Sequence, residues 1–131
     1  MKVYLSVPMI QNRALGRAHV MAKAIQDAGH EIASPWVLGP LERQDVAALN
    51  VFERDRKGAE GCDALVADVT VPSVGVGMEI MAAYKAGKRV ILVSRRGGLV
   101  SRMLIHMEPK ESVEYETEKE VYDGLLRALK G

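Results

Sequence analysis

The sequence predicts an α/β protein: a single domain over residues 1–131 with a three-layer, flavodoxin- or Rossmann-like fold around a five-stranded parallel sheet. Apolar runs of four to seven residues alternate with segments of helical period, the pattern of a parallel sheet with helices on both faces. The length of 131 residues and the hydrophobic content of 48% fit one domain with a sizeable core.

The expected strands and helices follow one another along the chain. The run at residues 64–69 is apolar at nearly every position, as a strand buried on both faces of a parallel sheet is. The helical segments have apolar residues at a period of 3.6, and Gly29 and Gly87 stand where two of them end. Strands are expected at residues 2–7, 31–34, 64–69, 89–94 and 113–115, and helices at residues 12–28, 43–60, 77–86, 100–106 and 117–130.

Charge and composition argue against several classes of partner. Lys and Arg number 18 against 17 Asp and Glu, a net charge of +1, and the basic residues are spread along the chain, which disfavours a polymeric nucleic acid. No apolar stretch is long enough to span a membrane, and the first residues run straight into a predicted strand, so we expect no export signal. The single cysteine, Cys62, excludes an internal disulfide and suits a reducing compartment. We therefore expect a cytoplasmic protein.

No metal or cofactor is expected. The three histidines, His19, His30 and His106, lie in separate elements with no cysteine or carboxylate at ligand spacing. The chain also lacks the glycine-rich loops of P-loop and dinucleotide-binding proteins.

The strongest functional signal is the segment Pro-Ser-Val-Gly-Val-Gly-Met-Glu at residues 72–79, where the buried strand gives way to a helix. Gly75 and Gly77 permit close approach of a ligand, and the N–H groups of the first helical turn favour an anion such as phosphate. We expect the positive helix end to keep the carboxylate of Glu79 ionised, so that it can attack carbon. The alternative is a tight turn followed by a glutamate that only offsets the helix dipole.

A second carboxylate, Asp55, precedes the buried strand, on a helical segment that can lean toward the same edge of the sheet. Two carboxylates with separate roles are what the cleavage of a glycosidic bond requires. The charged neighbours of Asp55 leave a second interpretation open, because such runs are usually solvated helix faces.

These residues resemble a known family. Tyr4 in the first strand, Asp55 and the run at residues 62–80 are similar to the nucleoside 2-deoxyribosyltransferase superfamily, and within it to the 2'-deoxynucleoside 5'-phosphate N-hydrolase branch. Ser73 decides between the branches. The transferases usually have there an Asp that binds the free 5'-hydroxyl of the sugar, whereas the hydrolases have a Ser that helps to hold a 5'-phosphate. An Asp would repel a phosphate dianion, while a Ser hydroxyl can donate to it.

The resemblance implies catalytic roles for three residues. Glu79 would be the nucleophile, Asp55 its acid/base or orienting partner, and Tyr4 the residue that positions Glu79 and the sugar. The expected partner is a small nucleotide.

The resemblance also implies a phosphate site and a homodimer. Ser73, Gly75 and Gly77 would cradle the phosphate. Ser101 resembles a serine that reaches the phosphate pocket of the neighbouring subunit.

The chain departs from the family on the side of the base. Ile10 stands where the hydrolases typically have an arginine, so Arg13 is the candidate substitute. Trp36 stands where a polar residue facing the base is expected, in an irregular stretch, residues 34–40, that we expect to cover the base.

Three functions follow as hypotheses. The first is hydrolysis of 2'-deoxynucleoside 5'-monophosphates to free base and 2-deoxyribose 5-phosphate. The second is a deoxyribosyltransferase that passes the sugar to another base through the same glycosyl-enzyme. The third is a non-catalytic nucleotide-binding domain, because a fold alone implies no chemistry.

Overall fold

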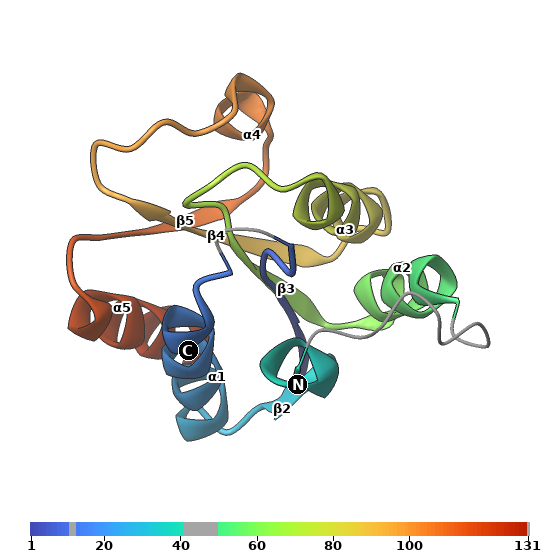
Figure 1. The fold of residues 1–131 in the computed structure, drawn as a ribbon, viewed down its shortest axis with the longest axis horizontal. Coiled ribbons are helices and arrows are strands. Elements are labelled where there is room, and N and C mark those ends of the chain that lie inside the picture. Colours follow the sequence, from blue (N-terminus) through green and yellow to red (C-terminus); the bar gives the residue numbers. More distant parts are fainter. Residues whose placement is uncertain (11–12, 41–49, 131) are drawn as a thin grey trace.

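Five parallel strands form one sheet in the order β2-β1-β3-β4-β5, which confirms the predicted fold class (Figure 1). The computed structural model describes residues 1–10, 13–40 and 50–130. The strands are β1 (Lys2–Ser6), β2 (Glu31–Ile32), β3 (Ala64–Asp68), β4 (Arg89–Arg95) and β5 (Glu111–Tyr115). The helices are α1 (Leu15–Asp27), the 3-10 helix η1 (Pro35–Leu38), α2 (Val51–Gly61), α3 (Val74–Lys85), α4 (Arg102–His106) and α5 (Glu118–Lys130).

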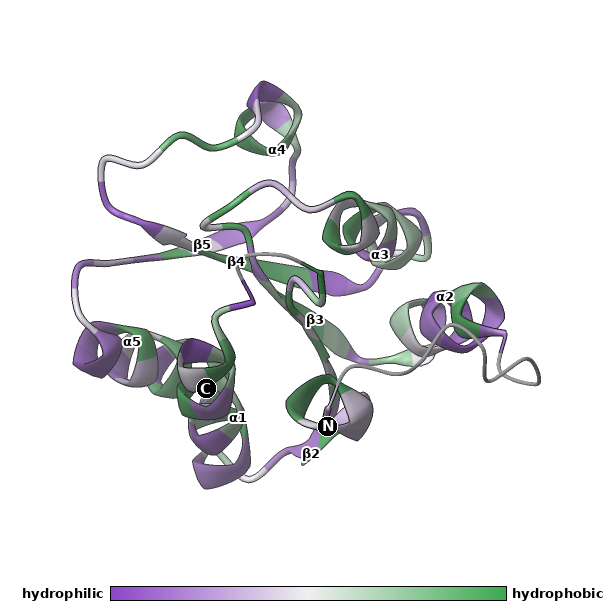
Figure 2. Cartoon of the chain, in the orientation of Figure 1, coloured by the Kyte–Doolittle hydropathy of each residue, from purple (hydrophilic) through white to green (hydrophobic). Residues whose placement is uncertain are grey.

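The helices cover the two faces of the sheet and enclose a separate core on each. Helices α1 and α5 pack on one face, and α2 and α3 on the other (Figure 1). Residues of β1 alternate between the two cores: Val3 and Leu5 face α1, whereas Tyr4 faces the side of α2 and α3. Figure 2 shows hydrophobic residues concentrated in the strands and over most of α3. The two expected positions for helix ends are confirmed, since Gly29 and Gly87 both have positive φ directly after a helix.

Strand β2 is shorter than the expected 31–34, because a serine side chain takes over its pairing with β1. The fully buried Ser34 hydroxyl donates to the carbonyl of Leu5 (2.8 Å) and accepts from the N–H of Leu5 (2.9 Å). These bonds satisfy the backbone of β1 where a strand ladder would otherwise continue.

Helix α3 begins at Val74 and not at the expected residue 77. The hydroxyl of Ser73 accepts a hydrogen bond from the N–H of Val76 (3.3 Å) and so forms the N-cap. Both glycines of the 72–79 segment therefore lie inside the first turns of the helix, and Glu79 lies further along it.

The start of α2 is described only from its N-cap. Asn50 accepts from the N–H of Glu53 (3.0 Å), and the helix runs from Val51. The expected helical residues 43–49 lie outside the described residues.

Candidate active site

Glu79 lies at the centre of the candidate site, where α3 meets β1. The hydroxyl of Tyr4 donates to its Oε2, and the hydroxyl of Ser6 donates to its Oε1 (2.8 Å). Tyr4 and Ser6 are both fully buried and point to the same face of β1, since they are two residues apart on one strand. A single rigid strand thus fixes both carboxylate oxygens.

Burial raises the pKa of Glu79 to about 7, and the nearby charge of Asp55 adds to this effect. The hydrogen bonds from Tyr4 and Ser6 favour the charged form but do not outweigh burial. The expectation that the helix end keeps this carboxylate fully ionised is therefore wrong, because Glu79 lies several residues inside α3 and away from most water. Burial also raises the pKa of Tyr4, so its hydroxyl stays protonated and can donate.

Asp55 reaches the site from α2. Its carboxylate accepts from Nε of Arg54 (2.8 Å), and both side chains are about one-quarter exposed or less. The charge of Asp55 raises the pKa of both Glu79 and Tyr4, so the two carboxylates lie close enough to interact.

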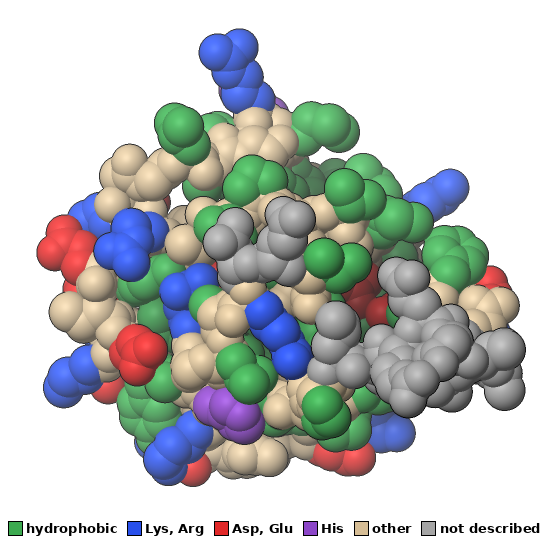
Figure 3. Space-filling view, in the orientation of Figure 1, with side chains coloured by type: hydrophobic (Ala, Val, Ile, Leu, Met, Phe, Trp, Pro, Cys, Tyr) green, Lys and Arg blue, Asp and Glu red, His purple; other side chains and the backbone are tan. Residues whose placement is uncertain are grey.

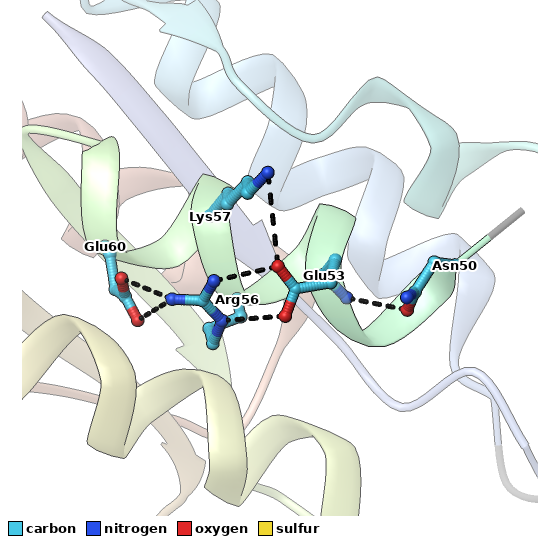
Figure 4. A network of polar contacts seen from close by, with 5 residues as sticks. All are labelled: Asn50, Glu53, Arg56, Lys57 and Glu60. Carbon is cyan, nitrogen blue, oxygen red and sulfur yellow. Dashed lines mark hydrogen bonds and ion pairs between the residues drawn. The ribbon is translucent and has the colours of Figure 1, made fainter.

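The charged run of α2 divides into two faces. Figure 4 shows the outer face, where Arg56 bridges Glu53 and Glu60 and Lys57 approaches Glu53. These ion pairs form a solvated charged helix face, the second interpretation of this run given in the sequence analysis. Asp55 does not belong to them, and its interactions are with the site.

One aromatic side chain, Trp36, packs beside Tyr4. The ring of Trp36, in η1, meets the ring of Tyr4 edge to face, with centroids 6.2 Å apart. The guanidinium of Arg54 lies 4.2 Å from the centroid of the Trp36 ring, a cation–π contact. Trp36 is thus next to the residue that holds Glu79.

Arg13 holds the η1 segment through hydrogen bonds to its backbone. Its Nη2 donates to the carbonyls of Val37 (2.9 Å) and Gly39 (2.5 Å), and its buried Nε has no partner among the described residues. This side chain therefore anchors the backbone next to Trp36. Its expected role in phosphate binding remains a prediction.

The N-terminal part of α3 leaves room for a ligand. A Cβ atom on Gly75 or Gly77 would meet no other atom within 4 Å, and both residues are exposed. The Ser73 hydroxyl, which caps the helix as an acceptor, keeps its own proton for another acceptor.

Ser101 lies apart from these residues, at the N-cap of α4, where its hydroxyl accepts from the N–H of Met103 (3.3 Å). Exposed apolar side chains surround this region on α3, on α4 and in the loop before α4 (Figure 3). They are Val74, Met78, Met81, Leu99, Met103 and Ile105. The cavity beneath α4, of about 330 Å³, is lined by none of the residues that surround Glu79.

Two residues of the site escaped the sequence analysis. Ser6 could have been found from strand alternation, because it is two residues from Tyr4 and shares its face. Arg54 lies next to Asp55 inside a charged run, and nothing in the run separates it from Arg56.

The described ranges contain no group of three or more His, Cys, Asp or Glu side chains that could hold a metal ion. Within the same ranges, no helix is long and apolar enough to cross a membrane.

Comparison with known proteins identifies the family. The sequence profile described as nucleoside 2-deoxyribosyltransferase matches residues 3–123. The chain belongs to the nucleoside 2-deoxyribosyltransferase family. This confirms the resemblance that the sequence indicated.

Two similar relatives carry the same name. One from Thermofilum pendens is 35% identical over 138 residues, covering 100% of this chain and 96% of that protein. One from Methanococcoides burtonii is 31% identical, covering 80% of this chain and 89% of that protein. Both are provisionally named 2'-deoxynucleoside 5'-phosphate N-hydrolase 1.

Solved structures share the fold. A CMP N-glycosidase from Clostridium botulinum superimposes with a TM-score of 0.70 at 22% identity, over 95% of this chain and 98% of that chain. A 2-deoxyribosyltransferase from Bacillus psychrosaccharolyticus gives a TM-score of 0.71 at 20% identity, over 98% and 96%. At this identity the likeness concerns the fold alone.

Proposed function

We propose that the protein is an N-glycosidase that hydrolyses 2'-deoxynucleoside 5'-monophosphates to free base and 2-deoxyribose 5-phosphate. One observation carries this proposal: the half-buried carboxylate of Glu79 is held at both oxygens by Tyr4 and Ser6, with the charge of Asp55 nearby. A carboxylate that is fixed and largely removed from water is suited to nucleophilic attack.

The reaction proceeds in two displacements. Glu79 attacks C1' of the sugar as the bond from C1' to the base nitrogen breaks, and the base leaves with the bonding electron pair. The leaving base takes a proton either from Asp55 in its protonated form or from a water molecule that the Asp55 carboxylate orients. A water molecule then adds its hydroxide to C1', which breaks the ester to Glu79, and its remaining proton passes to the group that protonated the base, the Asp55 carboxylate or the hydroxide.

The phosphate is assigned to the start of α3. Ser73 donates its hydroxyl proton, and the open surface over Gly75 and Gly77 lets the phosphate approach the first-turn N–H groups. A dianion bound here anchors the sugar so that C1' faces Glu79, because the phosphate site and the nucleophile belong to one helix.

The two relatives support the choice of substrate, since they are 35% and 31% identical to this chain over the matched residues and are provisionally named for this reaction. The description of the family supports a second candidate, transfer of the deoxyribosyl group to another base. Both reactions use the same glycosyl-enzyme, and they differ in whether water or a base accepts the sugar.

A panel of substrates tests the proposal. The protein is incubated with the deoxynucleoside monophosphates, the matching nucleosides and the ribonucleotides, each with and without a second free base, and the released bases are resolved by chromatography. Hydrolysis of monophosphates at rates well above those of nucleosides supports the hydrolase. Exchange of bases that outruns hydrolysis supports the transferase. Binding without base release supports the non-catalytic alternative.

A homodimer that shares its sites is the second part of the proposal. The exposed apolar side chains of α3 recur at Val74, Met78 and Met81, one face of a helix, and Ser101 stands beside exposed Leu99 and Met103. A second copy that covers this face would bury it and bring Ser101 to the partner's phosphate site.

Complementation between two inactive variants tests the shared site. If Ser101 acts across the interface, mixing Glu79→Gln with Ser101→Ala subunits restores one intact site in each heterodimer, and activity rises above that of either variant. If activity does not rise although sedimentation detects mixed dimers, Ser101 does not complete the partner's site. A fully active monomer would also refute this part.

A further inference from the structure

We infer that Ser6 is a positioning residue for Glu79: its hydroxyl fixes one carboxylate oxygen so that the group is oriented for attack on the sugar carbon. This inference rests on the proposed function and deepens it. Neither the motif at residues 72–79 nor the family resemblance pointed to Ser6.

The geometry gives Ser6 a specific task. Its side chain is fully buried at the end of β1, and its hydroxyl donates to Oε1 of Glu79 over 2.8 Å. Tyr4 donates to the other oxygen, Oε2. Because the two donors lie two residues apart on the same face of one strand, they fix the position of both oxygens. With Tyr4 alone, the carboxylate could pivot about the single hydrogen bond at Oε2.

A second buried serine on this part of the sheet provides the contrast. Ser34 is also fully buried, but within the described residues its hydroxyl bonds only backbone atoms of Leu5 and so holds β1 to the segment after β2. Ser6 bonds a titratable side chain. The hydroxyl of Ser34 therefore has a structural role, whereas the hydroxyl of Ser6 acts on the side chain proposed to react.

Four side chains set the electrostatics of Glu79. Tyr4 and Ser6 from β1 donate to it, while Asp55 and Arg54 from α2 act through their charges, Asp55 opposing ionisation and Arg54 favouring it. Burial and the charge of Asp55 raise the pKa of Glu79, and the hydrogen bond from Ser6 lowers it, so loss of this donor should raise the pKa further. The carboxylate should then hold its proton more tightly, by roughly one pH unit, the size expected for one hydrogen bond to a charged group.

The test measures the titration of Glu79 directly. Glutamate side-chain carboxyls are labelled with 13C and followed by NMR from pH 4 to 9, with the Glu79→Gln spectrum assigning the Glu79 signal. Ser6→Ala should raise the pKa of Glu79 by roughly one, and Ser34→Ala should leave it unchanged although it also removes a buried hydroxyl. This readout does not depend on turnover, so it stands even if the proposed reaction is wrong.

The pH profile of kcat/KM gives the second readout. With a pKa raised from about 7 to about 8, the ionised fraction at pH 7 falls about fivefold, and at pH 9 it is almost restored. Ser6→Ala should follow this pattern, and Ser6→Thr, which keeps a hydroxyl, should recover the wild-type profile. If the added methyl group prevents folding, Ser6→Cys, a weaker donor, should fall between wild type and Ser6→Ala.

Two results would overturn the inference. One is a Glu79 titration that Ser6→Ala leaves where it was. The other is a loss of kcat/KM that is equal at every pH from 6 to 9, which would make Ser6 a packing residue.

Discussion

Gly58 on α2 makes room for the ring of Tyr4: a Cβ atom at this position would lie 2.7 Å from Cε2 of the tyrosine. The helix that carries Asp55 therefore packs directly against the residue that holds Glu79. The spacing between the two carboxylates depends on this contact.

Gly58→Ala should damage the site through Tyr4. The extra methyl group must push the buried ring or α2 away, which should destabilise the protein by about 1–3 kcal/mol and lower kcat well below wild type. Thermal unfolding and the rate of base release measure the two effects. Gly61→Ala is the matched control, because a Cβ there meets nothing within 4 Å. Equal activity losses in the two variants would contradict the proposed contact.

Replacement of Glu79 by Gln should abolish base release while nucleotides still bind. The amide cannot form the ester at C1', but its oxygen can accept from Tyr4 and its NH2 can donate to Ser6. Single-turnover base release and calorimetric titration with a deoxynucleoside monophosphate check this. A rate within tenfold of wild type would exclude Glu79 as the nucleophile.

The pH dependence of activity should reflect the raised pKa of Glu79. Since the nucleophile must be ionised, kcat/KM should rise with pH through an acid limb near 7 and level off above it. In Asp55→Asn this limb should move to lower pH, because the nearby negative charge opposes the ionisation of Glu79. An acid limb near the ordinary glutamate value of 4.5 would contradict the burial of this carboxylate.

The contribution of Glu79 to the free energy of unfolding should fall as the pH rises, whereas kcat/KM should increase. A carboxyl whose pKa is raised on folding stabilises the native state below its unfolded value of 4.5, and this contribution is lost as the pH rises through about 7. Glu79→Gln should therefore be more stable than wild type at pH 8 by about 1–3 kcal/mol, and the difference should vanish near pH 4. Denaturant titrations at the two pH values test the sign, and a wild type that is the more stable protein at pH 8 would refute it.

Two substitutions at Ser73 separate helix capping from phosphate binding. Ser73→Ala should lose about 1 kcal/mol of stability together with the phosphate contact. Ser73→Asp keeps a good N-cap but repels the dianion, so it should retain stability and lose monophosphate cleavage more severely. The ratio of kcat/KM for a monophosphate to that for its nucleoside is the measure. If both variants leave this ratio unchanged, the phosphate does not bind at Ser73.

The effect of Arg13→Ala shows whether this side chain anchors the backbone or binds the phosphate. Its bonds to the carbonyls of Val37 and Gly39 predict that Arg13→Ala loosens η1 and the adjacent Trp36, raising KM for nucleosides and monophosphates alike. A selective loss for monophosphates would instead make Arg13 part of the phosphate site. Steady-state kinetics on both substrate types decide between them.

The sequence predicted the sheet and its order of elements because β3 and β4 are continuous apolar runs between helices, a pattern with few structural solutions. It also predicted Glu79, Asp55 and Tyr4 as a group, and the structure brings them together. It could not predict the proton affinity of Glu79, because that depends on burial by residues far apart in the chain. Nor could it separate Asp55 from the ion pairs on the outer face of α2, since the distinction depends on which way the helix faces.

The early start of α3 has a consequence for local stability. Gly75 and Gly77 lie within the helix, and each costs roughly 1 kcal/mol there relative to alanine. The turn that would meet the phosphate is thus intrinsically the weakest part of the helix, held mainly by the Ser73 cap. Its amide hydrogens should exchange with solvent faster than those near Ile80, and a bound anion should slow them. The helix end is then partly ordered by its own ligand.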